Sequence, residues 1–299
     1  MKLSLLDWKG APVAPARLVV SALNKEGEPC LIQRTSVDGN ANKGSVIVLA
    51  DGLTNTYYVV LYPTQSGSLK YQVTATAGAL TYQGTIGEYS LKAGHCYECS
   101  VMLNRTVDLS AIPSGFVAAD HDVLKGTGTR QFTIADGAAV KFSGVALNLS
   151  EGIVCAGSAR IILEDGTVNT ITSTGGGILA GPQGSGLYIS GGGELVVEAA
   201  STAIGGSSSR DCGHIFIESG TVKAFSGEST GAGIGSGKRH DCGNITISGG
   251  RLTLKGGGVY GAIEADGAVT ITDGVEYVDA TASYGAIRSE ASSISIGSG

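Results

Sequence analysis

Two glutamates, Glu164 and Glu218, each come directly after a short apolar-x-apolar segment. Paired carboxylic acids are the groups that glycoside hydrolases use, one donating a proton and the other activating water or attacking the sugar. If the two lie two turns apart in a stacked repeat, they are roughly 9–10 Å apart, near the ~6.5–9.5 Å of inverting enzymes. Two solvated residues on a polar sheet face would give the same pattern. We favour that interpretation and predict no catalytic residue.

Large apolar residues are expected to point outward beside these glutamates, with Ile162, Tyr188 and Phe216 on three consecutive repeats. An exposed apolar patch usually marks a contact surface. Aromatic rings stack on the apolar faces of sugars, and polar side chains at the rim supply hydrogen bonds. The candidate ligand-binding residues are Ile162, Tyr188, Phe216, Arg160, His214, Glu164 and Glu218. Packing of another part of the chain over this strip is the alternative.

Two matching segments, SSSRDCGH (207–214) and GKRHDCGN (237–244), concentrate charged residues. Stacking one turn apart would bring Asp211 within ~5 Å of Asp241, where like charges repel unless cations are near. A Ca²⁺ ion takes roughly six to eight oxygens, more than these side chains offer. Pairing with the basic residues of the same segments is therefore the favoured interpretation, and no metal site or cofactor is predicted.

Cys212 and Cys242 occupy the same place in these two segments. One turn apart, their Cα atoms would lie within the separation that a disulfide tolerates. A ladder of free thiols and a disulfide both remain open. Cys96 and Cys99 form a C-x-x-C pair, but the partner pair for zinc is missing, and residues i and i+3 of a strand face opposite sides. We interpret this pair as structural.

The elements that would position these residues are repeats of 24–30 residues. Residues 203–224 and 233–254 align at a constant offset of 30. Apolar-x-apolar units recur at Phe132/Ile134, Ile161/Leu163, Leu187/Ile189, Ile215/Ile217, Ile245/Ile247, Val269/Ile271 and Ile294/Ile296. A second series is Val140/Phe142, Val168/Thr170, Leu195/Val197, Val222/Ala224 and Leu252/Leu254, and a third is Ile153, Ile178, Ile204, Ile234, Ile263 and Ile287.

Three such short strands per repeat cannot bury a face alone, so successive repeats must stack on one another. Glycines at the corners permit the sharp turns between the strands. The sequence therefore predicts an all-β chain in which residues 126–299 form a right-handed parallel β-helix of about seven coils.

Residues 1–107 show a different pattern, with short alternating segments about 10–14 residues apart and turns such as Asp38-Gly39 between them. This pattern is typical of an antiparallel β-sandwich. Residues 108–125 interrupt the alternation and contain Pro113 and Gly115. We interpret them as a linker between two domains.

Composition excludes several classes of protein. Of the 299 residues, 48 are glycine, a share well above the usual ~7%. Because 42% of the residues are hydrophobic and the net charge is only −6, the chain is neither a collagen nor a disordered protein. No Lys/Arg-dense stretch is present, so a nucleic-acid partner is not expected. No apolar run approaches the ~18 residues of a transmembrane segment, and the first residues lack the apolar core of a signal peptide.

The segment LKAGHCYECSVMLNRT (91–106) resembles the closing strand of fimbrillin-type β-sandwich domains. The residues that carry the resemblance are Leu91, Ala93, Gly94, Tyr97, Val101 and Leu103. The segments GAGIGSG (231–237) and CGNITISGG (242–250) are similar to Gly-Ile-Gly β-helix repeats in surface proteins of Gram-negative anaerobes. The resemblance implies a non-enzymatic cell adhesion protein at the cell surface or outer membrane, lipid-anchored or secreted, with its export signal absent from this sequence. Fimbrillins have a second sandwich where this chain has the repeats, so polymerisation into a pilus shaft is not expected.

The expected partners are a glycan, a host protein or a pilus protein, bound on an outer face of the β-helix. The alternatives are a carbohydrate-active enzyme, either a polysaccharide lyase or a glycoside hydrolase, that uses Glu164 and Glu218, and a purely structural spacer. The C-terminal segment SISIGSG (293–299) ends in an uncapped coil, which solenoids normally cover. We expect coverage by a second copy through self-association, by a crossover loop over residues 273–284, or by residues outside this sequence.

Overall fold

The computed structural model describes residues 2–7, 17–23, 48–50, 56–59, 69–77, 80–90, 92, 96–207, 210–227, 231–236, 241–283, 285–290 and 292–297. These residues form strands and turns, and no helix occurs among them. The chain divides into two compact units, Met1–Val107 and Asp108–Gly299.

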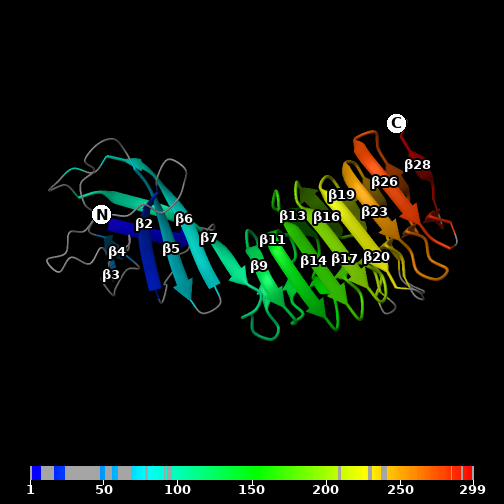
Figure 1. The fold of residues 1–299 in the computed structure, drawn as a ribbon, viewed down its shortest axis with the longest axis horizontal. Helices are drawn as coiled ribbons and strands as arrows, with labels where there is room; N and C mark the ends of the chain where they lie inside the picture. Colours follow the sequence, from blue (N-terminus) through cyan, green and yellow to red (C-terminus); the bar gives the residue numbers. More distant parts are fainter. Residues whose placement is uncertain are drawn as a thin grey trace. The chain divides into compact units, whose positions relative to one another are not determined.

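Unit 1, Met1–Val107, is built from strands in two pairing groups (Figure 1). Its strands are β1 (Lys2–Asp7), β2 (Arg17–Leu23), β3 (Val48–Ala50), β4 (Thr56–Val59), β5 (Leu69–Ala77), β6 (Leu80–Tyr89) and β7 (Glu98–Asp108). Strands β2, β5, β6 and β7 pair antiparallel in that order. Strands β3, β4 and β1 also pair antiparallel, whereas β1 pairs with β7 in parallel. These strands therefore do not form a purely antiparallel arrangement. The strand β1 was not expected from the sequence.

Unit 2 is a parallel β-solenoid of about five turns, in which strands of successive turns stack into three ladders (Figure 1). The first ladder contains the first half of β11 (Ala138–Leu149), β13 (Ala159–Leu163), β16 (Gly186–Gly191), β19 (His214–Ile217), β22 (Ile245–Ile247), β25 (Val269–Ile271) and β28 (Ile294–Ile296). The second contains the second half of β11, β14 (Val168–Ser173), β17 (Glu194–Ala199), β20 (Thr221–Ser226), β23 (Gly250–Lys255) and β26 (Val275–Thr281), with β9 (Val123–Gly128) pairing along β11. The third contains β8 (Val117–Ala118), β10 (Thr133–Ile134), β12 (Ile153–Cys155), β15 (Ile178–Leu179), β18 (Ile204–Gly205), β21 (Ile234–Gly235), β24 (Ile263–Ala265) and β27 (Ile287–Ser289).

The three ladders agree with most of the predicted repeat. The isoleucines from Ile153 to Ile287 are in register along the third ladder, as predicted. The first ladder matches the prediction from Leu187 onward, since Leu187 pairs with Ile215 and Ile215 with Ile245. The side chains of Leu187, Ile215 and Ile245 are fully buried, and each such burial stabilises the fold by about 1.5–3 kcal/mol. The seven coils of the prediction are not confirmed.

The earlier turns depart from the predicted register. Ile161 pairs with Ile189 instead of Leu187, a slip of two residues. Phe132 and Ile134 belong to the turn and strand of the third ladder, and Val140 pairs with Ile161 in the first. Alternation has a period of two residues, so a slip of two residues keeps every apolar side chain inward and leaves no mark in the pattern.

One strand is inverted relative to the prediction. Asn169 and Ile171 of β14 point inward, while Val168 is 55% exposed. The buried Asn169 side chain accepts a hydrogen bond from the Val145 N–H (3.0 Å) and donates to the Glu194 carbonyl (3.1 Å). A polar residue is tolerated inside because its amide satisfies backbone groups at a corner, and this bonding outweighs the burial of one valine.

The residues predicted as a linker lie in the solenoid. Unit 2 begins at Asp108, and within residues 108–125 β8 pairs with β10 and the start of β9 pairs with β11. Gly115, with φ +71°, forms part of the turn that precedes β8. These strands are too short to give a clear alternating pattern in the sequence.

The end of the solenoid also differs from one expectation. Residues 275–281 form β26, which pairs in parallel with β23, so this stretch is a strand of the second ladder and not a crossover loop. Beyond it, Ile294 and Ile296 of β28 are 46% and 62% exposed.

Candidate functional site

The outward residues of the first ladder form a continuous column. Arg160 pairs with Tyr188, Tyr188 with Phe216, Phe216 with Thr246, and Thr246 with Thr270. All five are half-buried. Successive parallel strands lie ~4.8 Å apart, so each side chain can contact the next.

The rings of Tyr188 and Phe216 stack face to face in this column. Their centroids are 4.5 Å apart and their planes differ by 7°. The guanidinium carbon of Arg160 lies 4.8 Å from the Tyr188 centroid, on the side of β13. Stacked pairs and cation–π contacts each contribute about 0.5–1.5 kcal/mol. The column is therefore a rigid, preformed arrangement.

Ile162 does not belong to this column. It pairs with Lys141 on one side and Ser190 on the other, two residues along the strands from Arg160 and Tyr188. The predicted strip of three stacked apolar residues is thus wrong at Ile162, because the register of β13 against β16 differs by two residues from that expected. Arg160 takes its place against Tyr188.

Glu218 is held by an ion pair that spans two turns. Both guanidinium nitrogens of Arg160 donate to its carboxylate, Nη2 at 3.3 Å from Oε1. Arg160 also lies 3.4 Å from Ser190 Oγ. The bond to Glu218 raises the pKa of Arg160 above its ordinary value. The two side chains are each more than a third exposed, and an ion pair in such a position contributes about 0–1 kcal/mol.

Glu164 interacts with different residues. Its carboxylate accepts a hydrogen bond from Ser143 Oγ and lies 3.8 Å from Lys141 Nζ, both on the β11 side. Glu164 and Glu218 are therefore each engaged by their own partners.

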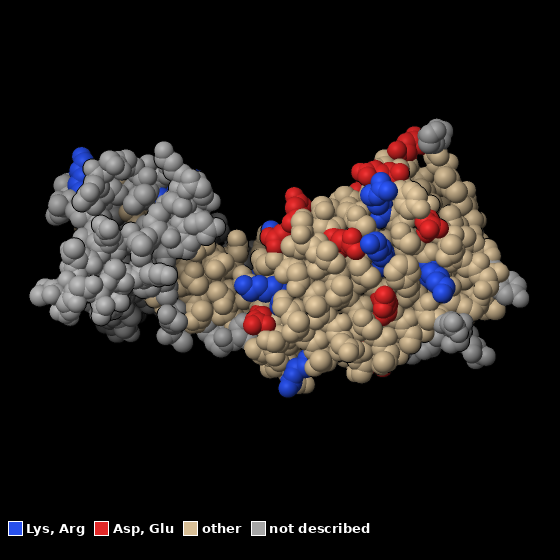
Figure 2. Space-filling view, in the orientation of Figure 1, with Lys and Arg blue, Asp and Glu red and all other residues tan. Residues whose placement is uncertain are grey.

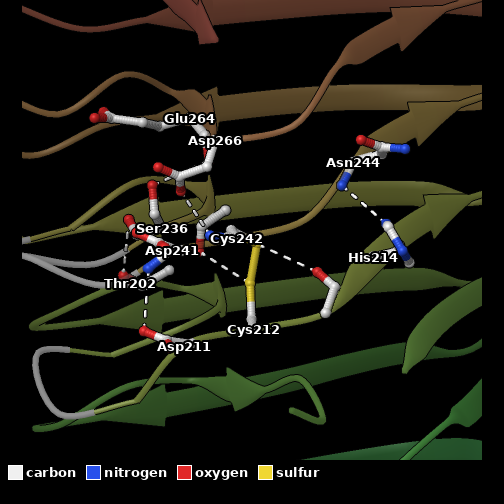
Figure 3. The surroundings of a disulfide bond; sticks show 12 residues. Thr202, Asp211, Cys212, His214, Ser236, Asp241, Cys242, Asn244, Glu264 and Asp266 are labelled. Carbon is white, nitrogen blue, oxygen red and sulfur yellow. Dashed lines mark hydrogen bonds between the residues drawn. A yellow bond between two sulfur atoms is a disulfide. The ribbon is translucent and has the colours of Figure 1, made fainter. Parts of the chain in front are cut away.

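His214 lies beside Phe216 and bonds the next turn. Its ring centroid is 6.3 Å from that of Phe216, at an angle of 51°. Nδ1 accepts a hydrogen bond from the Asn244 N–H at 2.9 Å (Figure 3). When the ring is neutral, the proton is therefore on Nε2.

A disulfide joins the corners that precede β19 and β22 (Figure 3). Cys212 and Cys242 are bonded, with their Cα atoms 4.6 Å apart and a sequence separation of 30. The backbones of the two cysteines also form an isolated parallel bridge. The bond therefore links two consecutive turns of the solenoid.

The aspartates around the disulfide bond the backbone of neighbouring turns (Figure 3). Asp211 Oδ1 accepts from the Asp241 N–H at 3.1 Å, and Asp266 Oδ2 accepts from the Cys242 N–H at 2.7 Å. Burial raises the pKa of Asp266 above its ordinary value, and the negative charges of Asp241, Glu290 and Asp211 add to the shift, although the bond to Cys242 opposes it. These carboxylates connect turns of the solenoid.

An open pocket of about 250 Å³ lies at the same corners. It is lined by Gln183, Gly184, Cys212, Gly213, His214, Asp241, Cys242, Gly243, Asp266 and Gly267. In the described part of the chain, no group of three or more His, Cys, Asp or Glu residues is arranged to hold a metal ion.

Several predicted participants lie outside the described residues. Lys238, Arg239 and His240, expected beside the aspartates, are among them, and so are Cys30 and the motif residues Leu91, Ala93 and Gly94. Cys96 is exposed, Cys99 is half-buried and Cys155 is buried, and none of the three is in a disulfide. Burial raises the pKa of Cys155 to about 12, which keeps its thiol protonated.

The sequence did not single out Thr246 and Thr270, which belong to the column, or Ser190 and Asn244, which lie beside it. The 30-residue repeat could have located Asn244 and Thr246, since they stand opposite His214 and Phe216 at that offset. Arg288 and the buried Glu264, whose atoms lie 3.1 Å apart, were also missed. Glu264 lies within the segment that follows Ile263, and an acidic residue next to an inward isoleucine gives no signal of burial.

Acidic and basic side chains are intermixed on the face of unit 2 seen in Figure 2. Neither sign forms a continuous patch there. Most of this face is uncharged.

The fold and the column define a class only, a parallel β-solenoid with an aromatic column on one ladder. Comparisons with family models, curated proteins and solved structures find no match for this chain. Among the described residues, no helix is long and apolar enough to cross a membrane.

Proposed function

We propose that this chain is a non-enzymatic adhesion protein of the cell surface, whose solenoid presents its first ladder to a glycan or protein ligand. The observation that carries the proposal is the column of Arg160, Tyr188 and Phe216. Stacked rings held by an ion-paired arginine form a surface that needs no ordering when a ligand binds, which lowers the entropic cost of binding.

The disulfide supports a location outside the cytosol. Disulfides persist in oxidising compartments and are rare where glutathione and thioredoxin keep thiols reduced. The bond between Cys212 and Cys242 therefore favours export to the cell surface or outer membrane, with the chain either lipid-anchored or secreted.

For unit 1 we propose a sandwich of the fimbrillin type. Support comes from β7, whose first half pairs with β1 and whose second half pairs with β6. One strand thus joins the two pairing groups, as strands do that pass between the sheets of a sandwich. For unit 2 we propose right-handed winding, the usual hand of parallel crossovers.

The carbohydrate-active enzyme is the second candidate, and the geometry favours it less. Arg160 neutralises Glu218, and Glu164 is bonded to Ser143 near Lys141. A substrate would have to displace these partners before either carboxylate could act on it. We expect no release of reducing ends or unsaturated uronides from a polysaccharide panel. Release that is lost in Glu218→Gln would support the enzyme.

The binding function is tested with the whole chain on a broad glycan array and by cross-linking to intact cells, with the same protein after heat denaturation as control. Saturable binding to a glycan or to one surface protein is expected. A native protein that captures neither would contradict the adhesion proposal and favour a structural spacer.

A further inference from the structure

Among the described residues, one aromatic face of the column has neither a ring nor a guanidinium against it. The ring of Tyr188 has Arg160 over one side and Phe216 against the other. Phe216 has Tyr188 on the side of β16, and its register partner on the side of β22 is Thr246. Threonine is too small to cover a phenyl ring, so the β22 face of Phe216 is the available stacking surface.

Beyond that face, the next two residues of the column have short side chains that end in hydroxyl groups. Thr246 is followed in register by Thr270, and both are half-buried. Neither hydroxyl takes part in a hydrogen bond with the described residues. We call the surface formed by the free face of Phe216 with Thr246 and Thr270 the Phe216 shelf.

Two hydrogen-bond donors border the Phe216 shelf. His214 Nε2 is the protonated nitrogen of the neutral ring, because Nδ1 accepts from Asn244. Asn244 is exposed, and its Oδ1 accepts a hydrogen bond from the Ala268 N–H at 3.0 Å. The amide N–H₂ group of Asn244 takes no part in that bond. Neither donor group is used within the described part of the chain.

An apolar ring face bordered by donors and hydroxyls matches the chemistry of a pyranose. One face of such a sugar carries C–H groups that stack on an aromatic ring, and its rim carries hydroxyls that both donate and accept. The cation of the column, Arg160, is bonded to Glu218, so an anionic sugar gains little from it. A peptide could not add to the sheet here, because β22 is paired with both β19 and β25.

We propose that the Phe216 shelf binds a neutral sugar ring of a glycan, stacked on Phe216 above Thr246 and Thr270. This inference rests on the proposed adhesion function and narrows its ligand to a neutral glycan. It also assigns unequal roles to the two rings, with Phe216 as the platform and Tyr188 as its support.

The test measures binding of the whole chain to short oligosaccharides of glucose, mannose and galactose by calorimetry, with oligogalacturonate as the anionic comparison. Phe216→Leu keeps an apolar side chain but removes the ring, and we expect about tenfold weaker binding. Phe225→Leu is the matched control, since Phe225 is a half-buried outward residue of β20 on the second ladder, between Glu198 and Lys255. It should bind as the unmodified chain does.

A second variant fills the shelf. In Thr246→Ile the larger aliphatic side chain would lie against the free face of Phe216 without offering a ring of its own, and pairs of an aromatic with a β-branched residue stabilise sheets. This variant should fold and lose binding of neutral sugars. Its folding is checked by circular dichroism and thermal unfolding.

Equal affinities of Phe216→Leu and Phe225→Leu, binding retained by Thr246→Ile, or binding of oligogalacturonate alone would each overturn the proposal. If the whole chain still binds a glycan or a surface protein in those cases, the adhesion function stands and only the Phe216 shelf is excluded. If it binds no neutral oligosaccharide, the shelf proposal fails. If it also captures nothing on the array or on cells, the adhesion function fails with it.

Discussion

At the scale of single residues, buried polar groups are kept in the solenoid by hydrogen bonds to its corners. Asn169 is fully buried and bonds the backbone of Val145 and Glu194. Glu264 is only 3% exposed, accepts from the Gly261 N–H at 2.6 Å and lies 3.1 Å from an Arg288 nitrogen. An unpaired buried polar group is costly, so these residues fix the corners they bond.

Glu264 should make stability depend on pH in an unusual direction. Burial raises its pKa above the ordinary value of 4.5, more than the bond to Gly261 and the charge of Arg288 lower it. The folded state therefore binds the proton more tightly than the unfolded chain, and this contribution to stability is lost as pH rises through the raised pKa.

The free energy of unfolding of the unmodified chain, relative to Glu264→Gln, should increase as pH is lowered from 7 toward 4.5. Urea unfolding followed by circular dichroism at several pH values measures this difference. A difference that stays constant or shrinks over that range would show that burial does not govern the ionisation of Glu264.

At the scale of the elements, the third ladder depends on close backbone approach. Gly205 and Gly235 pair along β18 and β21 with φ of +138° and +124°. A Cβ on Gly235 would overlap the Glu264 carbonyl oxygen of the next turn. In each Ile-Gly pair the isoleucine side chain points into the core, and the glycine, which has no side chain, lets the backbone of the next turn come close.

Replacement of Gly235 by alanine should destabilise the chain by about 3 kcal/mol or more, from backbone strain together with the steric overlap. Gly137→Ala is the matched control, since Gly137 also has a positive φ (+74°) but nothing within 4 Å of the added Cβ. It should lose only about 1–2 kcal/mol. Chemical unfolding of both variants makes the comparison, and equal losses would contradict the packing argument.

At the scale of the whole molecule, the solenoid is a stack in which each turn contacts its neighbours, so its weak points are places where adjacent turns separate. The disulfide crosses one such boundary and closes a 30-residue separation, about the length of one repeat. Its position beside the aspartate bonds of Asp211 and Asp266 makes these corners a reinforced part of unit 2.

Loss of the disulfide should lower the free energy of unfolding by about 3–4 kcal/mol, the loop-entropy estimate for a separation of this length. The Cys212→Ser/Cys242→Ser variant is compared with Cys99→Ser, which removes a cysteine that is in no disulfide. Thermal unfolding with and without reductant should separate the two. Titration of all six thiols in the denatured, non-reduced chain would show that the bond is absent.

The sequence determined the repeat, the three ladders and their register from Leu187 onward, because inward isoleucines and corner glycines recur at nearly constant spacing. It also located Tyr188, Phe216, His214 and Glu218 on one face. These results follow from periodicity, which is a local property of the chain.

Which outward residues touch is set by packing between the turns. Ile161 pairs with Ile189, and this two-residue slip, invisible to an alternating pattern, places Arg160 and not Ile162 against Tyr188. The pairing then brings Arg160 to Glu218 across two turns and covers both faces of Tyr188. Several registers would keep the apolar side chains inward. The length of each corner and corner hydrogen bonds such as those of Asn169 select one of them when the turns pack together.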